Sequence, residues 1–505
     1  MKSFIRISLF LIVFQIALGL SNTTVKADIV AQWAPDARVL GYLDDTFTPY
    51  LVADQNGTVH AFASQWINDG SRRSAVVYRQ WSLLGGWTRP VDVILTPTGN
   101  AQILGAFLDS SDKMHIIFMA GEARDAAVYY SFAPAANADL VTAWSIPIMV
   151  GENALGLNSA VIAGDDQGNL FIIYSGNRDG NGVYFVTSSD SGESWSELFP
   201  VFLTSDTTLL PFSLRLAISQ DYQVRATWNV VTSVGVDEAL YFANYSVRNS
   251  EWGNPVELDR RIDLPEYFGP SFPAMADNGS DIVILYNGGN PYAGQFVNPG
   301  RPVMRASISS DGGLTWDGPG NPFPLLNGRS GEHALAVDSM GGVHGVFVMR
   351  IDQYVDGENE TIGGIWHSKF QDGIWTNPDR FVTTYSPHDV RATVSQGNVL
   401  LVVWREDPGA GKHGVWFSYT ILDTPELPII PLSTVPITVS AQPASTVIPF
   451  LATPTQPPED NIFEDSSPSR WSTNPVFPLV AGIVPVVLVV IGIFVVYRFL
   501  INRRT

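Results

Sequence analysis

The chain has 505 residues, of which 45% are hydrophobic and 11% aromatic, and it contains no cysteine, so disulfides and thiol chemistry are excluded. Its 29 basic and 49 acidic residues give a formal net charge of −20. A nucleic-acid-binding protein needs a basic surface, so we expect no nucleic-acid partner.

The N-terminal residues 1–27 have the organisation of a secretory signal peptide. Lys2 and Arg6 precede an apolar run over residues 9–20, and small residues around Ala27 suit cleavage after it. We therefore expect the mature chain to lie outside the cytoplasm.

One apolar strand pattern then recurs seven times, each copy following a turn rich in Asp, Gly or Asn. The copies are residues 57–62, 113–118, 169–174, 223–228, 281–286, 342–347 and 398–404. A further strand follows each copy, as in residues 75–78, 183–186 and 414–417. Apolar runs of this length between turn residues are typical of β-strands.

A tryptophan with a proline two to five residues later follows six of the seven copies. The pairs are Trp87/Pro90, Trp144/Pro147, Trp195/Pro200, Trp252/Pro255, Trp316/Pro319 and Trp375/Pro378. The seventh pair stands at the other end of the repeat, as Trp33 and Pro35. Successive tryptophans lie between 51 (144 to 195) and 64 (252 to 316) residues apart, enough for a four-stranded blade. The sequence therefore predicts an all-β, seven-bladed β-propeller over residues 28–422, whose N-terminal strand completes the last blade.

Two copies of a Ser-x-Asp-x-Gly-x-Ser/Thr-Trp turn punctuate the repeat. The copies are Ser188, Asp190, Gly192 and Trp195, and Ser309, Asp311, Gly313 and Trp316. Ser and Asp can hydrogen-bond the turn's own backbone, Gly can take a positive φ, and Trp can anchor the turn in the core. The pattern resembles the Asp box (BNR repeat) of sialidases and other β-propellers, so the chain is similar to the sialidase-like superfamily. The box is a structural turn and indicates architecture, not activity.

The resemblance implies a specific chemistry if the protein is an enzyme. Sialidases use a Tyr nucleophile helped by Glu, an acid/base Asp and three Arg on the substrate carboxylate. The chain departs from them, because it has seven repeats where sialidases have six blades. Its mature part also lacks their early Arg-Ile/Leu-Pro motif. No motif assigns a catalytic role to one position, so the catalytic residues stay unknown.

Arginine and acidic residues gather in two kinds of loop that share one face of a propeller. These loops join the second strand to the third within a blade, or join two blades, and such loops often carry function. The ligand-binding candidates are Arg124, Asp125, Arg178, Asp179, Arg329, Glu332, Arg350, Asp352, His388, Asp389, Arg405, Glu406 and Asp407. Arginine forks suit carboxylates, so we predict a ligand site here. The alternative is that each Arg pairs with a neighbouring acid and ties a loop.

No metal or cofactor site is predicted. Asp-rich turns such as residues 165–168 do not have the ligand spacing of a calcium loop, so we interpret them as hairpin turns.

The C-terminal part changes composition. Pro, Ser and Thr dominate residues 423–475, which we predict to be a disordered stalk. The uncharged run 477–497 reaches about 31 Å as a helix, enough to cross a bilayer. Arginines follow it, so we predict a transmembrane helix over 476–498 and a cytoplasmic tail over 499–505.

These features favour a single-pass plasma-membrane protein whose external propeller presents a loop face to a glycan or to an extracellular or envelope protein. The alternative is a sialidase-like exo-glycosidase acting on terminal acidic sugars, and a third is a structural role in an envelope complex. Three arginines converging near the axis beside a Tyr–carboxylate pair would favour the enzyme. Arginines that each bond a local acid would disfavour it.

Overall fold

A computed structural model describes residues 32–67, 73–96, 100–121, 126–155, 159–219, 221–263, 267–289, 302–324, 326, 333–355, 358–384, 387–406 and 413–433. For residues 350–355 and 358–362 it describes the backbone alone. The predicted signal peptide, most of the predicted stalk and the predicted span lie outside these ranges and stay predictions. Within the ranges, no helix has the length and apolarity needed to cross a membrane.

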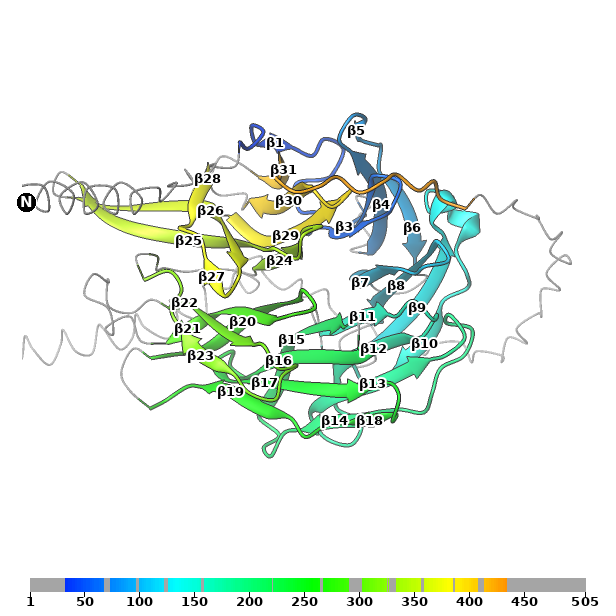
Figure 1. Ribbon diagram of the computed structural model, residues 1–505. Helices are drawn as coiled ribbons and strands as arrows, with labels where there is room; N and C mark the ends of the chain where they lie inside the picture. The colour runs from blue at the N-terminus through cyan, green and yellow to red at the C-terminus, as the bar shows by residue number, and fades with distance from the viewer. Residues whose placement is uncertain are drawn as a thin grey trace, which may run out of the picture. The chain divides into compact units, whose positions relative to one another are not determined.

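The described residues form seven antiparallel sheets, which are the blades of a β-propeller (Figure 1). Blade 1 contains β2 (Tyr50–Ala53), β3 (Thr58–Trp66), β4 (Ser74–Ser82), β5 (Gly86–Trp87) and β6 (Val91–Leu95). Blade 2 contains β7 (Gln102–Leu108), β8 (Lys113–Ala120), β9 (Ala127–Pro134) and β10 (Ile148–Gly151), with the 3-10 helices η1 (Ala135–Asn137) and η2 (Val141–Ala143) before β10. Blade 3 contains β11 (Ala160–Gly164), β12 (Leu170–Gly176), β13 (Gly182–Ser188) and β14 (Phe199–Leu203).

The other four blades repeat this order from the inside outward. Blade 4 contains β15 (Leu209–Ile218), β16 (Gln223–Thr232), β17 (Asp237–Ser246), β18 (Glu251–Trp252) and β19 (Val256–Arg260). Blade 5 contains β20 (Phe268–Asp277), β21 (Ile282–Gly289), β22 (Val303–Ser309) and β23 (Asp317–Gly320). Blade 6 contains β24 (Ala334–Val337), β25 (Val343–Val355), β26 (Glu358–Gln371), β27 (Ile374–Trp375) and β28 (Asp379–Thr383). Blade 7 contains β29 (Pro387–Ser395), β30 (Val399–Glu406), β31 (Gly414–Ile421) and β1 (Ala37–Arg38).

The seven innermost strands close into a ring. Strands β2, β7, β11, β15, β20, β24 and β29 contact one another in that order, and β29 contacts β2. The prediction of an all-β seven-bladed propeller is therefore confirmed. Each inner strand is the end of its own sheet, and closure of the ring shields its unpaired edge.

The N-terminal segment completes blade 7, as predicted. Ala37 of β1 pairs with Phe417 of β31, and Trp33 forms a bridge with Thr420. Trp33 also stacks on Phe381 of blade 6, with 3.7 Å between ring centroids. The first described strand thus joins the last blade without a covalent link.

The turns between the first and second strands are built around an aspartate. In blades 1, 2, 3 and 6 its Oδ1 accepts two backbone N–H groups of the turn, from the residues two and four positions later. These turns define the hairpin face of the propeller, which also carries the turns between the third and fourth strands. The opposite side is the loop face.

Three blades add a buried histidine to this aspartate. The Oδ2–Nε2 distances are 3.2 Å for Asp54 and His60, 3.1 Å for Asp109 and His115, and 3.0 Å for Asp338 and His344. The other ring nitrogen, Nδ1, lies 2.7 Å from Tyr78 Oη, 2.6 Å from Tyr130 Oη and 2.9 Å from His367 Nε2, respectively. Each line of three side chains links the turn to the third strand, so these histidines belong to the core.

The two Ser-x-Asp-x-Gly turns have the local bonds that their sequence predicts. Ser188 Oγ donates to Asp190 Oδ1 at 2.7 Å and accepts the Gly192 N–H at 2.9 Å, and Ser309 makes the same two bonds in blade 5. Trp195 of blade 3 packs on Tyr130 of blade 2, with 5.0 Å between ring centroids. Trp316 of blade 5 packs on Phe242 of blade 4 at 4.7 Å. Each turn thus anchors its blade to the preceding one.

Candidate functional site

The structure describes the side chains of six of the predicted ligand-binding residues. Arg124, Asp125, Arg329, Glu332 and Asp407 lie outside the described residues, and Arg350 and Asp352 are described by their backbone in β25 alone. The six described are Arg178, Asp179, His388, Asp389, Arg405 and Glu406.

In blade 3, Arg178 forms an ordinary ion pair on the surface with Glu152. Its Nη1 lies 3.4 Å from Glu152 Oε1, and both side chains are half exposed. The neighbouring Asp179 donates its backbone N–H to Tyr184 Oη at 2.8 Å. These contacts tie a loop, the alternative that the sequence left open. Arg260 pairs in the same way with Glu257, and Arg261 with Glu238.

At the junction of blades 7 and 1, two arginines lie against aromatic rings. The Arg405 Cζ is 5.3 Å from the centre of the Phe47 ring, and the Arg391 Cζ is 4.8 Å from the centre of the Tyr50 ring. Arg405 Nη2 is also 3.4 Å from Asp389 Oδ2. All five side chains are half-buried. We call them the arginine–aromatic cluster.

The strand register explains how the two arginines come together. Arg405 pairs with His388, and Arg391 pairs with Val403, so both arginines lie on the same face of the blade 7 sheet. The register shifts between these pairs, where Asp389 has a φ of 52°. This bulge re-aims the chain, as bulges do beside functional sites. The sequence predicts Arg405, His388 and Asp389 as site residues, but the rings that contact Arg405 and Arg391 lie at the start of blade 1.

Glu406 lies below this surface. It is fully buried, and its Oε1 accepts the Trp404 Nε1–H at 2.8 Å. Its position in the interior supports the end of β30 and does not offer a carboxylate to a ligand at the surface.

A second polar constellation joins blades 4 and 5. Arg305 Nη1 donates to Tyr267 Oη at 2.7 Å and lies 3.0 Å from Asp259 Oδ2. Burial raises the pKa of Asp259. Nearby on the loop side of blade 4, Asp237 accepts a hydrogen bond from Asn229 Nδ2 at 2.7 Å, and burial raises its pKa to about 7. Tyr267 immediately precedes β20, whereas Arg305 stands inside β22, where the sequence pattern gives no functional signal.

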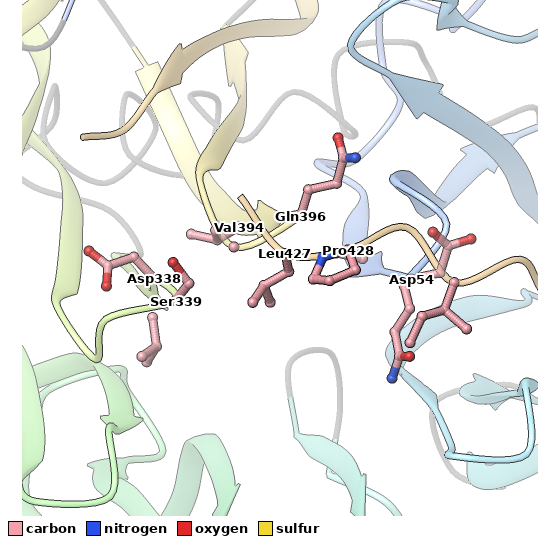
Figure 2. A pocket seen from close by; sticks show the side chains of 12 residues that line it. Asp54, Asp338, Ser339, Val394, Gln396, Leu427 and Pro428 are labelled. Atoms are coloured by element: carbon pink, nitrogen blue, oxygen red, sulfur yellow. The ribbon is translucent and has the colours of Figure 1, made fainter. Parts of the chain in front are cut away.

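The hairpin face carries a pocket of about 440 Å³ (Figure 2). Residues 424–433, which we call the strap, cross this face, although the sequence places them in the predicted stalk. In Figure 2 the strap residues Leu427 and Pro428 lie between Ser339 and Val394 on one side and Asp54 on the other. Among all the described residues, including those that line this pocket, no group of three His, Asp or Glu side chains is placed to hold a metal.

Comparison with known proteins finds solved structures that are similar to this chain. A PL25 polysaccharide lyase, ulvan lyase bound to -[GlcA(1-4)Rha3S]-, is 11% identical, with 77% of this chain and 96% of that chain covered at a TM-score of 0.50. The polysaccharide lyase Uly1 is 12% identical over 80% and 94%, with a TM-score of 0.46. A leech intramolecular trans-sialidase is 10% identical over 75% and 68%, with a TM-score of 0.36. No family model and no curated protein matches. At these identities the first likeness shows the propeller fold alone.

Proposed function

We propose that the protein is a glycan-binding propeller that holds an acidic sugar at the arginine–aromatic cluster. The observation that carries this proposal is the pair Arg391 and Arg405, each half-buried and each lying against a ring of blade 1.

A guanidinium held over an aromatic ring suits sugar recognition for physical reasons. The ring limits the rotamers of the arginine, so less side-chain entropy is lost when a ligand binds. A guanidinium has five N–H donors in a fixed fork, so the ion pair with Asp389 does not use up the capacity of Arg405. That fork matches a carboxylate in a bidentate way. Tyr50 and Phe47 supply apolar surface of the kind that lines ligand sites.

The fold supports the same class of ligand. Ulvan lyase, whose structure contains a glucuronate-bearing saccharide, has a propeller of the same arrangement. This chain is strongly acidic, with a net charge of −20, so an acidic ligand requires a local basic site. The cluster supplies two such groups at one blade junction.

The binding experiment uses the purified full chain in detergent and oligosaccharides that carry a uronate, a sialic acid or no charge. We expect Arg405→Ala and Arg391→Ala each to weaken binding of the acidic saccharides at least tenfold, with higher salt weakening binding in the parent chain. Arg178→Ala is the matched control, since Arg178 already pairs with Glu152 on the surface. Equal affinities in the parent chain and both cluster variants would refute this site.

The predicted signal peptide, stalk and span support presentation of the propeller outside the plasma membrane. We expect the full chain to stay with membranes after alkaline extraction and a chain ending at residue 475 to be released. Release of both the full chain and the shortened chain would contradict a membrane anchor. It would leave the proposed sugar site unaffected.

A second candidate function is exo-glycosidase activity, favoured by the constellation of Tyr267, Arg305 and Asp259. A tyrosine hydroxyl bonded by an arginine beside a carboxylate contains residue types that the sialidase resemblance implies. Fluorogenic glycosides led by a sialoside test it: turnover that disappears in Tyr267→Phe would establish the enzyme. If no glycoside of the panel is turned over across a wide pH range, the exo-glycosidase proposal fails and glycan binding remains the proposed function.

A further inference from the structure

The strap crosses the hairpin face where the ring closes. Past the end of β31 at Ile421, Thr424 Oγ1 donates to the Gly397 carbonyl at 3.2 Å. Ser339 Oγ of blade 6 donates to the Pro425 carbonyl at 2.6 Å. Figure 1 draws this part of the chain in orange beyond β31. The strap has no helix or strand of its own, so its order comes from the propeller beneath it.

Every third residue of the strap donates its backbone N–H to a different blade. Leu427 donates to the Gln396 carbonyl of blade 7 at 2.8 Å, and Ile430 donates to the Gln55 carbonyl of blade 1 at 2.8 Å. Ser433 donates to Asp112 Oδ2 of blade 2 at 2.9 Å. All three acceptors belong to the same turn, the one between the first and second strands, in consecutive blades. The donors therefore follow the repeat of the ring.

The sequence of the strap matches this three-residue period. Prolines stand at positions 425, 428 and 431, each two residues before a donor. Proline fixes φ near −65° and biases the preceding residue to extended backbone, so the segment favours polyproline II. That helix has three residues per turn and advances about 9 Å in three residues. A donor at every third position thus lies on one side of the strap and meets one blade after another.

Side-chain packing fixes the strap at both ends. A Cβ at Gly397 would lie 2.7 Å from Leu427 Cγ, so only a glycine allows the strap this approach. Leu432 packs against the apolar core shared by blades 1 and 2. The middle of the strap, Pro428 and Ile430, forms one wall of the hairpin-face pocket.

We propose that the turns of blades 7, 1 and 2 form a recognition site for a proline-repeat segment in the polyproline II conformation, and that the strap is its resident ligand. Two backbone carbonyls and the Asp112 carboxylate accept an N–H from every third residue, and the intervening prolines lower the entropy lost on docking. The resident strap locks the blade 7–blade 1 junction, where β1 contributes only Ala37 and Arg38 to the sheet. This site is on the hairpin face and is independent of the sugar site.

Proline substitutions test the proposal, because they keep the polyproline II backbone and remove the docking N–H together with the side chain, and Leu427→Ala, which removes the side chain and keeps the N–H, separates the two losses. In the full chain, Leu427→Pro with Ile430→Pro deletes two of the three docking donors. The matched control is Ile429→Pro, an exposed residue of the same segment whose N–H makes none of the three bonds. Amide exchange at Ser433 reports strap docking, and anisotropy of a labelled peptide of residues 423–434 reports whether the vacated site binds it.

We expect exchange at Ser433 to rise at least tenfold in the double variant and to stay unchanged in Ile429→Pro. The labelled peptide should bind the double variant, and bind neither the parent chain nor the control, in which the tethered strap outcompetes it. The proposal is overturned if Ser433 stays protected after both donors are removed, or if the strap is released and the peptide still does not bind. If the double variant fails to fold, Leu427→Pro alone against Ile429→Pro gives the same comparison.

Discussion

His115 Nε2 lies 3.1 Å from Asp109 Oδ2, and both side chains are buried between the hairpin turn and the third strand of blade 2. Tyr130 Oη completes the line at His115 Nδ1. The same arrangement in blades 1 and 6 makes it a repeated element of the core.

Replacing His115 by Phe should destabilise the propeller by about 1–3 kcal/mol, because Asp109 and Tyr130 each lose a buried partner. The equivalent residue of blade 3, six positions after Asp165, is Phe171, so a phenylalanine ring is compatible with this position. Urea unfolding measures the change. Adding Tyr130→Phe should recover part of the loss. An unchanged unfolding free energy in His115→Phe would show that the line of bonds is dispensable.

The stability of the propeller should fall as the pH falls from about 6.5 to 3. Burial, with His344 and Lys369 nearby, lowers the pKa of His367 to about 3 from its ordinary 6.5. The native state keeps this ring neutral while the unfolded chain takes up a proton, so each such histidine removes up to about 1.4 kcal/mol per pH unit within that window. Urea unfolding from pH 7 to 4.5 tests this. His367→Gln should reduce the dependence of the unfolding free energy on pH, even if it lowers stability at pH 7. An unaltered pH dependence would contradict the lowered pKa of His367.

Arg225 of blade 4 and Asp277 of blade 5 form an ion pair that is almost completely buried. Asp277→Ala should cost about 3–5 kcal/mol, because it leaves the buried guanidinium with only the more distant and exposed Asp221, 3.7 Å away, as a carboxylate partner. Arg225→Met combined with Asp277→Ala should cost clearly less than the two single changes added together. Strict additivity in thermal or urea unfolding would argue against a coupled pair.

Gly192 and Gly373 separate steric crowding from backbone strain. Both have positive φ, 88° and 80°, but a Cβ at Gly192 would lie 1.9 Å from Tyr130 Oη, whereas a Cβ at Gly373 meets nothing within 4 Å. Gly373→Ala should therefore cost about 1 kcal/mol, the strain alone. Gly192→Ala should cost several times more, since Trp195 and Tyr130 must also move apart. Equal losses in the two variants would mean that the turn of blade 3 does not anchor it to blade 2.

The fold was predictable because each blade carries its own copy of the signal. The apolar second strand, the tryptophan near the fourth strand and the displaced copy at Trp33 are all local patterns, and they suffice to count seven blades. The contacts of Arg405 and Arg391 were not predictable, since their rings belong to the first blade and the arginines to the last. An aspartate six residues before a histidine recurs at Asp54, Asp109 and Asp338, so that part of the core did have a readable signal.

The proline-rich composition of the strap predicts some of its properties but not its docking on the propeller. It predicts a segment without a core of its own. Composition says nothing about docking on another part of the chain, and the donors at Leu427, Ile430 and Ser433 become visible only beside the turns that accept them. Residues 434–475 of the predicted stalk lie outside the described residues.

The closure of blade 7 by β1 also sets an order for biosynthesis. Trp33 is made long before its partner Thr420, so during translation six blades can assemble while the first strand of the chain waits for the last. Until residue 421 has emerged, β1 and the edge of β30 are both unpaired strands exposed to other chains. A nascent chain that stops before β31 therefore cannot close the ring. It exposes two unpaired strand edges, at β1 and β30, that can pair with other chains.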